Sequence, residues 1–500
     1  MSRSRHVALI IAATSIVWLS GCAELVILFG PDGFFPPSGG VLGDAAPAGS
    51  TAVGVDPGTG GLQGAGNTVP VTTQPAPIAP ASYRVTLLDD LLEQSAGAGM
   101  IIQTDLDRDG VTDFASISSE SQVVLLHLRD PQTMRFLQLT VGGGAPLAFM
   151  QRIAAADFDG DGNTDLAVAV HDTGFTPLQC AQKVGMIVLL FAPSDPREQL
   201  DWVVVPLPNS IPPMNHHDTL SITDLAIADF DGQNGPDIAF AANLGCPGPP
   251  PIRFINLFLN PGGAAARDGS MWGVPRNGRA PFVHIEASDL SRLFAADLDG
   301  DGSPDLVANS PNAKSFNIRW LRNPGGAAID PDPAADLPPW ETRIIGQQDL
   351  AADALAVGDI DGDGAIDVAS ATDTQSLVQW FQNPGHDRVV RQTFPWLVYN
   401  VGALPPPGGM INQLQIVDLN DDGRLDAWVG ASGTIFAFFP RDGESFLDYW
   451  TPTTIVSTNP PATIGFPAFL DLNGDGKTDM IVPFDRPGLS QDQFATLAQE

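Results

Sequence analysis

The nine residues D-F-D-G-D-G-N-T-D from Asp157 to Asp165 decide the fold, because close variants of them occur seven times along the chain. The other copies begin at Asp105, Asp229, Asp297, Asp359, Asp418 and Asp471, and successive copies begin 52 to 72 residues apart. A motif that recurs at a spacing of this size indicates a repeat architecture. We number its positions 1 to 9 in every copy.

The motif offers oxygen ligands for a hard cation. Ca²⁺ takes about six to eight oxygens from carboxylates, amides, backbone carbonyls and water. Side chains at positions 1, 3 and 5 can converge, glycine at position 6 allows a left-handed turn, the carbonyl of position 7 faces the ion, and Asp at position 9 completes the shell. The candidate ligands, copy by copy, are Asp105, Asp107, Asp109, Val111 and Asp113; Asp157, Asp159, Asp161, Asn163 and Asp165; Asp229, Asp231, Gln233 and Asp237; Asp297, Asp299, Asp301, Ser303 and Asp305; Asp359, Asp361, Asp363, Ala365 and Asp367; Asp418, Asn420, Asp422, Arg424 and Asp426; Asp471, Asn473, Asp475, Lys477 and Asp479.

The residues around the motif are typical of strands. An EF-hand begins with the same D-x-D-x-D-G pattern but requires Glu at position 12 and flanking helices. Here Leu166-Ala-Val-Ala-Val170 follows the second copy, which places the loop in a β-hairpin. The alternative is a plain acidic turn, since Asp and Gly both favour turns. Seven copies with the same ligand positions favour calcium, with about six to seven sites expected.

The third copy departs from the pattern, with Gln233 at position 5 and Asn234 at position 6. Gln still offers an amide oxygen, and Asn tolerates the left-handed conformation. Because this loop has lost one negative charge, we expect it to be the weakest calcium site. Whether it holds an ion at all stays open.

The composition agrees with metal loops on a folded, acidic protein. The formal net charge is −34, from 58 acidic and 24 basic residues. Twenty-five of the acidic residues are motif aspartates: seven at position 1, five at position 3, six at position 5 and seven at position 9. Such a chain should repel nucleic acid, whose binding depends on neutralising phosphates. With 43% hydrophobic residues it is too apolar for a disordered acidic chain.

The N-terminus has the features of a targeting segment. Arg3 and Arg5 precede an apolar run from Val7 to Leu19, which predicts a signal peptide over residues 1–21 rather than a membrane span. The ending L-S-G-C resembles a bacterial lipobox, which implies cleavage before Cys22, lipidation of its thiol and a lipid anchor in the membrane. The alternative is an ordinary signal peptide with a chance cysteine. Residues 22–81 are rich in Gly, Pro and Ala, as in a flexible tether.

Residues 82–500 read as repeats of four short strands. In the repeat that starts at Leu293–Ala296, Asp305–Asn309 follows the acidic loop, the third strand ends in W-L-R-N-P-G at 320–325, and Glu341–Ile345 is the fourth strand. Asn-Pro-Gly is a strong turn signal. Seven such repeats predict an all-β fold, a seven-bladed β-propeller of four-stranded blades with calcium-binding hairpin loops.

The seventh repeat lacks chain after its second strand, Met480–Pro483. We expect Tyr83–Leu88 to act as its fourth strand and close the ring, and Phe494–Ala498 to act as its third strand. Because that third strand is a weak candidate, the completeness of this blade stays open.

The unit V-x-D-x-D-G-D-G-x-x-D-(I/L/V)-A-V, followed by W-x-x-N-P-G, resembles the FG-GAP and VCBS repeats of bacterial envelope proteins and the calcium-loop blades of integrin α subunits. The resemblance covers about Ser82 to Pro483. It implies a seven-bladed propeller with Ca²⁺ in the hairpin loops between the first and second strands.

Cys180 and Cys246 remain after the predicted lipidation. Both follow second strands, of the second and third repeats, so they should emerge on one face. An even pair in an exported protein suggests a disulfide, but sequence does not set their separation, so the free state stays open.

Familiar catalytic motifs are missing from the sequence: G-x-S-x-G, a P-loop and H-E-x-x-H. His216-His217 could bind a transition metal or act as a base, but an adjacent pair without an acidic partner is more often a surface pair. We therefore expect a non-enzymatic scaffold for binding, adhesion or assembly, anchored by lipid at the bacterial cell envelope. Its partner would be an unidentified envelope protein or glycan. The alternative is a carbohydrate-binding or carbohydrate-active propeller that resembles polysaccharide lyases.

Overall fold

The computed structural model divides into two units, Met1–Gln74 and Pro75–Glu500, of which only the second contains described residues. The described residues are 83–88, 99–117, 123–142, 147, 150–170, 185–198, 201–207, 219–245, 252–272, 283–284, 292–309, 318–325, 340–346, 354–372, 376–391, 395–405, 410–440, 450–458, 463–485 and 493–499. The predicted signal peptide and tether, Cys22, Cys180, Cys246 and His216-His217 lie outside them.

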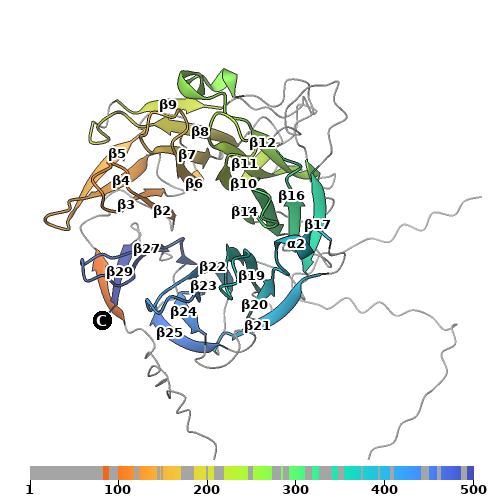
Figure 1. Cartoon of the computed structure of the whole chain (residues 1–500). Coiled ribbons are helices and arrows are strands. Elements are labelled where there is room, and N and C mark those ends of the chain that lie inside the picture. Colours follow the sequence, from red (N-terminus) through yellow and green to blue (C-terminus); the bar gives the residue numbers. More distant parts are fainter. Residues whose placement is uncertain are drawn as a thin grey trace, which may run out of the picture. The chain divides into compact units, whose positions relative to one another are not determined.

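Seven antiparallel sheets make up the second unit (Figure 1). Six of them are four-stranded meanders in chain order. The strands of these six blades are β2 (Met100–Thr104), β3 (Asp113–Ile117), β4 (Val124–Arg129) and β5 (Phe136–Val141); β6 (Met150–Ala156), β7 (Asp165–Val170), β8 (Met186–Phe191) and β9 (Val203–Pro206); β10 (Thr219–Ala228), β11 (Asp237–Gly245), β12 (Ile252–Phe258) and β13 (Val283–His284); β14 (Arg292–Ala296), β15 (Asp305–Asn309), β16 (Ile318–Arg322) and β17 (Glu341–Gly346); β18 (Ala354–Gly358), β19 (Asp367–Thr372), β20 (Leu377–Gln382) and β21 (Leu397–Ala403); β22 (Ile411–Val417), β23 (Asp426–Ala431), β24 (Thr434–Phe439) and β25 (Thr451–Ser457).

The seventh blade is complete and closes the ring. Its first strand is split into β26 (Thr463–Ile464) and β27 (Ala468–Leu470), followed by β28 (Asp479–Asp485) and β29 (Gln493–Gln499). The fourth strand is β1 (Tyr83–Leu88), which pairs antiparallel with β29 from Tyr83↔Gln499 to Leu88↔Phe494. Both strands proposed from the sequence for this blade are therefore confirmed, and the pairing of β1 with β29 completes it.

First strands of neighbouring blades contact one another around the centre of the ring, while fourth strands lie at its rim (Figure 1). The all-β, seven-bladed propeller predicted from the repeat is confirmed. The described helical segments are short: η3 (Gly263–Arg267), η4 (Gly269–Met271) and α2 (His386–Val389). None of the helices in the described part of the chain has the length and apolar character needed to span a bilayer.

The hydrophobic core consists of seven clusters, each between two adjacent blades. Second strands are buried throughout, as in the all-buried Asp165–Val170 and Asp305–Asn309, because both faces of an inner strand meet a neighbouring blade. Trp340, Trp396 and Trp450 precede fourth strands, are 9%, 6% and 3% exposed, and belong to clusters shared with the preceding blade. They therefore pack the contacts between neighbouring blades.

Candidate metal loops and axial pocket

The acidic loops connect first to second strands and share one backbone conformation. The position 1 carboxylate caps the turn: in the second blade Asp157 accepts hydrogen bonds from the amides of Gly160 (2.8 Å), Asp161 (3.1 Å) and Gly162 (2.8 Å). Gly162 at position 6 has φ +86°, a region that glycine enters without strain. In the third blade Asn234 takes this position with φ +62°, as predicted from its tolerance of the left-handed region.

The position 2 side chain and the position 9 carboxylate anchor each loop in the protein. Phe158 at position 2 is fully buried between blades, and its amide donates to Asp165 Oδ2 (3.0 Å). Asp165 is also fully buried, and its Oδ1 accepts from the amide of Ala192, just after the third strand (2.8 Å). A buried carboxylate held by two backbone amides is a fixed point on which the rest of the loop is built.

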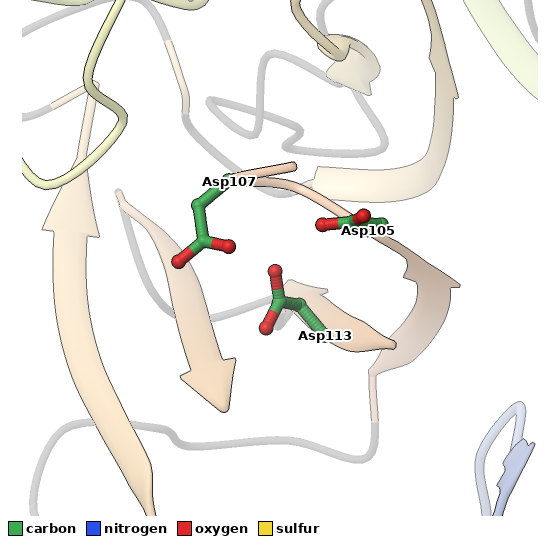
Figure 2. Close-up of side chains that lie close together, drawn as sticks. All are labelled: Asp105, Asp107 and Asp113. Carbon is green, nitrogen blue, oxygen red and sulfur yellow. The ribbon is translucent and has the colours of Figure 1, made fainter. Parts of the chain in front are cut away.

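The carboxylates at positions 1, 3 and 9 come together in the first five blades. Each trio offers three oxygens that lie within 4.8 Å of one another. Figure 2 shows Asp105, Asp107 and Asp113 turned toward a common space. The third blade forms such a trio as well, from Asp229, Asp231 and Asp237, despite its altered turn.

The position 5 aspartates are not members of these trios and instead cap the second half of the loop. Asp161 Oδ1 accepts from the amide of Asn163 (2.8 Å), and Asp301 Oδ1 accepts from that of Ser303 (2.9 Å). The same contact involves the position 7 amides of Val111, Ala365, Arg424 and Lys477.

Blades six and seven replace the position 3 carboxylate with an amide. Asn420 Nδ2 donates to Asp422 (3.2 Å), and Asn473 Nδ2 donates to Asp475 (3.0 Å). The amide oxygen of each asparagine accepts from the position 5 backbone amide, as the position 3 aspartates do elsewhere. These loops keep the same shape with one carboxylate fewer.

The donor set fits a hard metal cation. Oδ1 of Asp107, of Asp359 and of Asn163 is buried and accepts no hydrogen bond from the described residues. A buried acceptor without a donor is costly, and a cation at the centre of the loop would satisfy it.

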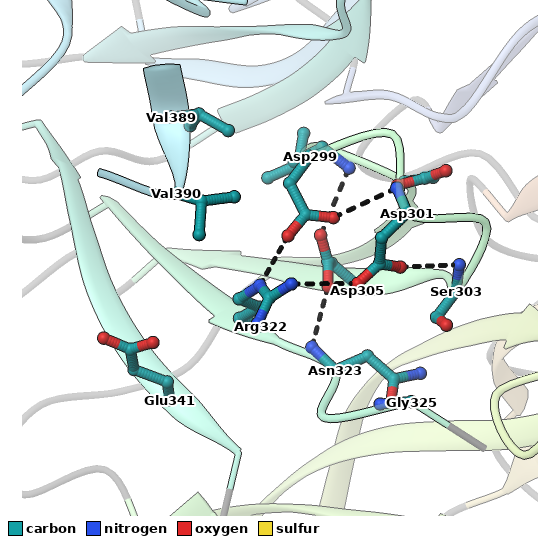
Figure 3. A network of polar contacts seen from close by, with 12 residues as sticks. Asp299, Asp301, Ser303, Asp305, Arg322, Asn323, Gly325, Glu341, Val389 and Val390 are labelled. Atoms are coloured by element: carbon teal, nitrogen blue, oxygen red, sulfur yellow. Dashed lines mark hydrogen bonds and ion pairs between the residues drawn. The ribbon is translucent and has the colours of Figure 1, made fainter. Parts of the chain in front are cut away.

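Arginines already compensate part of this charge, and Figure 3 shows one of them, Arg322, beside Asp299 and Asp301. Arg322 on β16 contacts Asp299 through Nε and Asp301 through Nη2 (2.9 Å). Arg267 on η3 does the same for Asp159 and Asp161 of the preceding blade, and Arg197 reaches Asp107. Each of these guanidinium groups contacts a position 3 carboxylate, and Arg322 and Arg267 also contact position 5. Among the described residues, no arginine pairs with a position 9 carboxylate.

Burial raises the pKa of the position 9 carboxyls in the absence of a cation. The pKa is about 7 for Asp113, Asp165, Asp237, Asp305 and Asp367, and the two backbone amides only partly offset the cost of burying the charge. Neighbouring loop carboxylates raise it further. A metal ion would reverse this balance by favouring the ionised form.

The asparagine of Asn-Pro-Gly, predicted only as part of a turn, is a buried link between blades. Asn323 donates from Nδ2 to the carbonyls of Phe230 (3.0 Å) and Pro304 (2.9 Å), and its Oδ1 accepts from the amide of Gly325 (2.9 Å). Phe230 is at position 2 of the preceding blade. Asn260 and Asn383 make the same set of contacts. The sequence feature that could have indicated this link is the recurrence of the asparagine in three copies of the repeat.

Blades six and seven vary this link position. Gln499 fills it in blade seven, where its amide nitrogen can donate to Asp421 Oδ2 (3.1 Å) and Thr478 O (3.3 Å). In blade six the position is held by Pro440, which has no N–H. Asp426 Oδ1 is therefore buried without a partner, and the pKa of Asp426 rises to about 8, chiefly through burial.

A pocket of about 300 Å³ lies among the first strands, separate from the metal loops. Residues of β2, β6, β14, β22 and β26 line it, together with Gly465 and Phe466 where the first strand of blade seven is interrupted. We call it the axial pocket. Its charged lining residues are Arg152 and Arg292, which no feature of the sequence had singled out.

Solved structures similar to this chain include BBS1N in complex with ARL6DN, at 12% identity and TM-score 0.43, covering 83% of this chain and 96% of that one. The Dos1 propeller has 11% identity and TM-score 0.39, covering 81% of each chain. An Agrocybe aegerita lectin that recognises non-reducing terminal N-acetylglucosamine has 13% identity and TM-score 0.38, covering 72% of this chain and 81% of that one. No curated protein matches the sequence.

The FG-GAP-like repeat matches residues 105–168, 297–370, 359–429 and 418–482, which together make up half of the 500 residues. Each matched segment begins at position 1 of an acidic loop and ends within the second strand of the next blade. The protein belongs to the FG-GAP-like repeat family.

Proposed function

We propose that this protein is a calcium-stabilised, lipid-anchored propeller of the bacterial cell envelope that acts as a non-enzymatic scaffold for binding, adhesion or assembly. The convergence of the carboxylates at positions 1, 3 and 9 carries the calcium part of the proposal. Oxygen-only ligands, with a backbone carbonyl at position 7 and room for water, suit Ca²⁺ better than softer metals, which prefer nitrogen or sulfur.

Calcium would act mainly on stability. At a free concentration tenfold above Kd, each site contributes about 1.4 kcal/mol to the free energy of unfolding. Six or seven independent sites would contribute roughly 8–10 kcal/mol, comparable with the whole stability of a typical domain.

The experiment is calcium titration with metal counting on the purified protein, followed by melting with and without chelator. We expect the five loops with a complete carboxylate trio to bind calcium more tightly than those of blades six and seven, where Asn420 and Asn473 replace a trio carboxylate. Among the five, the third blade, where Gln233 replaces Asp at position 5, should bind most weakly. Chelation should lower the melting temperature substantially. Seven equivalent sites would contradict the ranking. A melting curve that chelator leaves unchanged, with no calcium in the purified protein, would reduce the loops to plain acidic turns.

The anchor is tested separately. The L-S-G-C ending at 19–22 supports lipidation of Cys22. We expect Cys22→Ser to abolish labelling with a lipid precursor and to release the protein from the membrane fraction. Equal processing and membrane association of the variant would refute the anchor without touching the calcium proposal.

A scaffold role is supported by the chemistry of the axial pocket. Arginine, amide, methionine and aromatic groups line it, and no carboxylate or imidazole is found among its lining residues in the described part of the chain. Acid–base catalysis depends on such groups, whereas binding does not. A protein or glycan partner is part of the same proposal and is tested by capture from envelope extract and by a glycan array.

A further inference from the structure

The axial pocket carries a positive charge that its own residues do not neutralise. Arg152 and Arg292 both line it, in a chain of net charge −34. Asp224 pairs with Arg152 through Nε (2.9 Å). The same carboxylate also accepts from the amides of Leu225 (3.0 Å) and Leu293 (2.9 Å). One carboxylate thus faces two guanidinium groups.

Arg292 is almost completely buried, with 6% of its surface exposed. Its Nη2 donates to the carbonyl of Asn412 (2.9 Å) and to Gln413 Oε1 (3.0 Å), but Nη1 has no acceptor among the described residues. Burial and then the nearby Arg152 lower the pKa of Arg292 to about 9. A buried guanidinium held by neutral acceptors favours the approach of an anion.

Phe466 brings the two arginines together. The guanidinium carbon of Arg292 lies 4.3 Å from the ring centroid, and that of Arg152 lies 5.1 Å from it. Phe466 is half-buried and sits where the first strand of blade seven is interrupted, and its backbone is hydrogen-bonded to Gly99 and Ile101. A ligand would therefore reach Nη1 by rotation of the Phe466 side chain alone.

The pocket also holds an acceptor that lacks a donor. Asn412 Nδ2 donates to the carbonyl of Ile464 (2.8 Å), whereas its Oδ1 is buried and accepts nothing from the described residues. A complementary ligand therefore offers a hydroxyl beside its anionic group. The apolar surface of Met100, Met150 and Phe466 suits the carbon skeleton between them.

We propose that the axial pocket binds a small hydroxycarboxylate, such as a single sugar acid, with its carboxylate on Arg292 and Arg152 and a hydroxyl on Asn412. One uncompensated positive charge matches a monoanion, and a carboxylate oxygen can accept a charge-assisted hydrogen bond from Arg292 Nη1, which has no acceptor among the described residues. A volume of about 300 Å³ is at the lower end of ligand pockets, which suits one sugar ring rather than a chain. The proposal goes beyond the scaffold function and does not depend on the metal loops.

The test is titration calorimetry on the full chain at saturating calcium, with D-glucuronate as the probe. D-glucose, acetate and sulfate separate the contributions of the hydroxyls, the carboxylate and bare charge. We expect one glucuronate per chain, with glucose, acetate and sulfate each binding at least roughly tenfold more weakly.

Arg292→Gln should weaken glucuronate binding roughly 10- to 100-fold, the loss typical of a charged hydrogen bond. Should Arg292→Gln fail to fold, Arg152→Gln serves instead, since Arg152 is only partly buried and its loss should weaken binding in the same direction. Arg343→Gln is the matched control, because Arg343 also stacks on an aromatic ring (5.1 Å from Trp320) but lies on the rim strand β17. Absence of saturable glucuronate binding, equal binding of sulfate, or unchanged affinity in the Arg152 and Arg292 variants would overturn the proposal.

Discussion

Replacement of Asn323 by alanine should weaken the contact between blade four and blade three. The Asn323 side chain is fully buried and makes three hydrogen bonds, two to carbonyls and one from an amide. Its own backbone amide would still donate to Asp305 Oδ1. Alanine thus removes only the side-chain contacts and leaves the carbonyls of Phe230 and Pro304 without a donor.

The expected loss in the free energy of unfolding follows from these three hydrogen bonds. Each contributes about 0.5–1.5 kcal/mol net, and a buried group left without a partner costs about 1–3 kcal/mol. We expect the free energy of unfolding to fall by roughly 3 kcal/mol or more. Asn323→Asp should cost at least as much, because it keeps the acceptor for Gly325 while placing carboxylate oxygens against two carbonyls.

The assay combines equilibrium urea unfolding at saturating calcium with hydrogen exchange followed by mass spectrometry. We expect faster exchange in peptides that cover Asp229–Asp237 of blade three and Asp297–Asp305 of blade four, with little change in blades one and seven. Gln132→Ala, which removes an exposed amide in the turn after β4, is the control. A loss below about 1 kcal/mol with unchanged exchange at Asp229–Asp237 would refute the assignment of Asn323 as an inter-blade link.

Three further predictions concern the metal loops. Asp361→Ala should lower the melting temperature and increase hydrogen exchange in blade five more than Asp442→Ala, a change outside any motif; equal effects would argue against a metal at Asp361. Pro440→Ala should supply a backbone amide to Asp426 Oδ1 and lower the pKa of Asp426. The free energy of unfolding should rise by about 1 kcal/mol, because the new hydrogen bond is partly offset by the loss of the rigid proline. An unchanged urea midpoint would show that this oxygen already has a hydrogen-bond donor. The pKa of the position 9 carboxyls is near 7 in the folded protein and about 4 in the unfolded chain, so these groups bind protons more tightly when the protein is folded. The free energy of unfolding of the calcium-free protein should therefore fall as the pH rises from about 4 to 7. Because calcium binds the ionised form, the melting temperature lost on adding a pH-insensitive chelator should be larger at pH 8 than at pH 5.5, and the reverse order would contradict the role of these groups.

Sequence alone was sufficient for the fold because the information is local and repeated. Asp157 to Asp165 specify a hairpin within nine residues, and strand-like residues such as Leu166 to Val170 continue it. Seven copies then leave a closed ring as the simplest way to protect the sheet edges. Even the closing strand Tyr83–Leu88 could be predicted, since it was a strand without a repeat of its own.

The contacts between blades could not be predicted in the same way. Asn323 and Phe230 are 93 residues apart, and Arg267 and Asp159 are 108 residues apart. In the sequence, a turn accounts fully for Asn-Pro-Gly. The hydrogen bonds of its asparagine to the neighbouring blade are visible only in the structure. The axial pocket is harder still, because Arg152, Arg292 and Phe466 come from three blades and share no motif.

The metal loops and the inter-blade links form one connected system. The position 9 carboxylate accepts from the position 2 amide of its own loop and from the link residue after the third strand, as Asp305 does with Leu298 and Asn323. Asn323 in turn donates to the position 2 carbonyl of the preceding loop. A cation that ionises and fixes Asp305 therefore also fixes the residue that holds blade three, so neighbouring sites should bind with positive coupling. Pro440 can offer neither an N–H nor a side-chain amide, so this coupling should be weakest between blades five and six. That junction is where we expect the ring to open first when calcium is withdrawn.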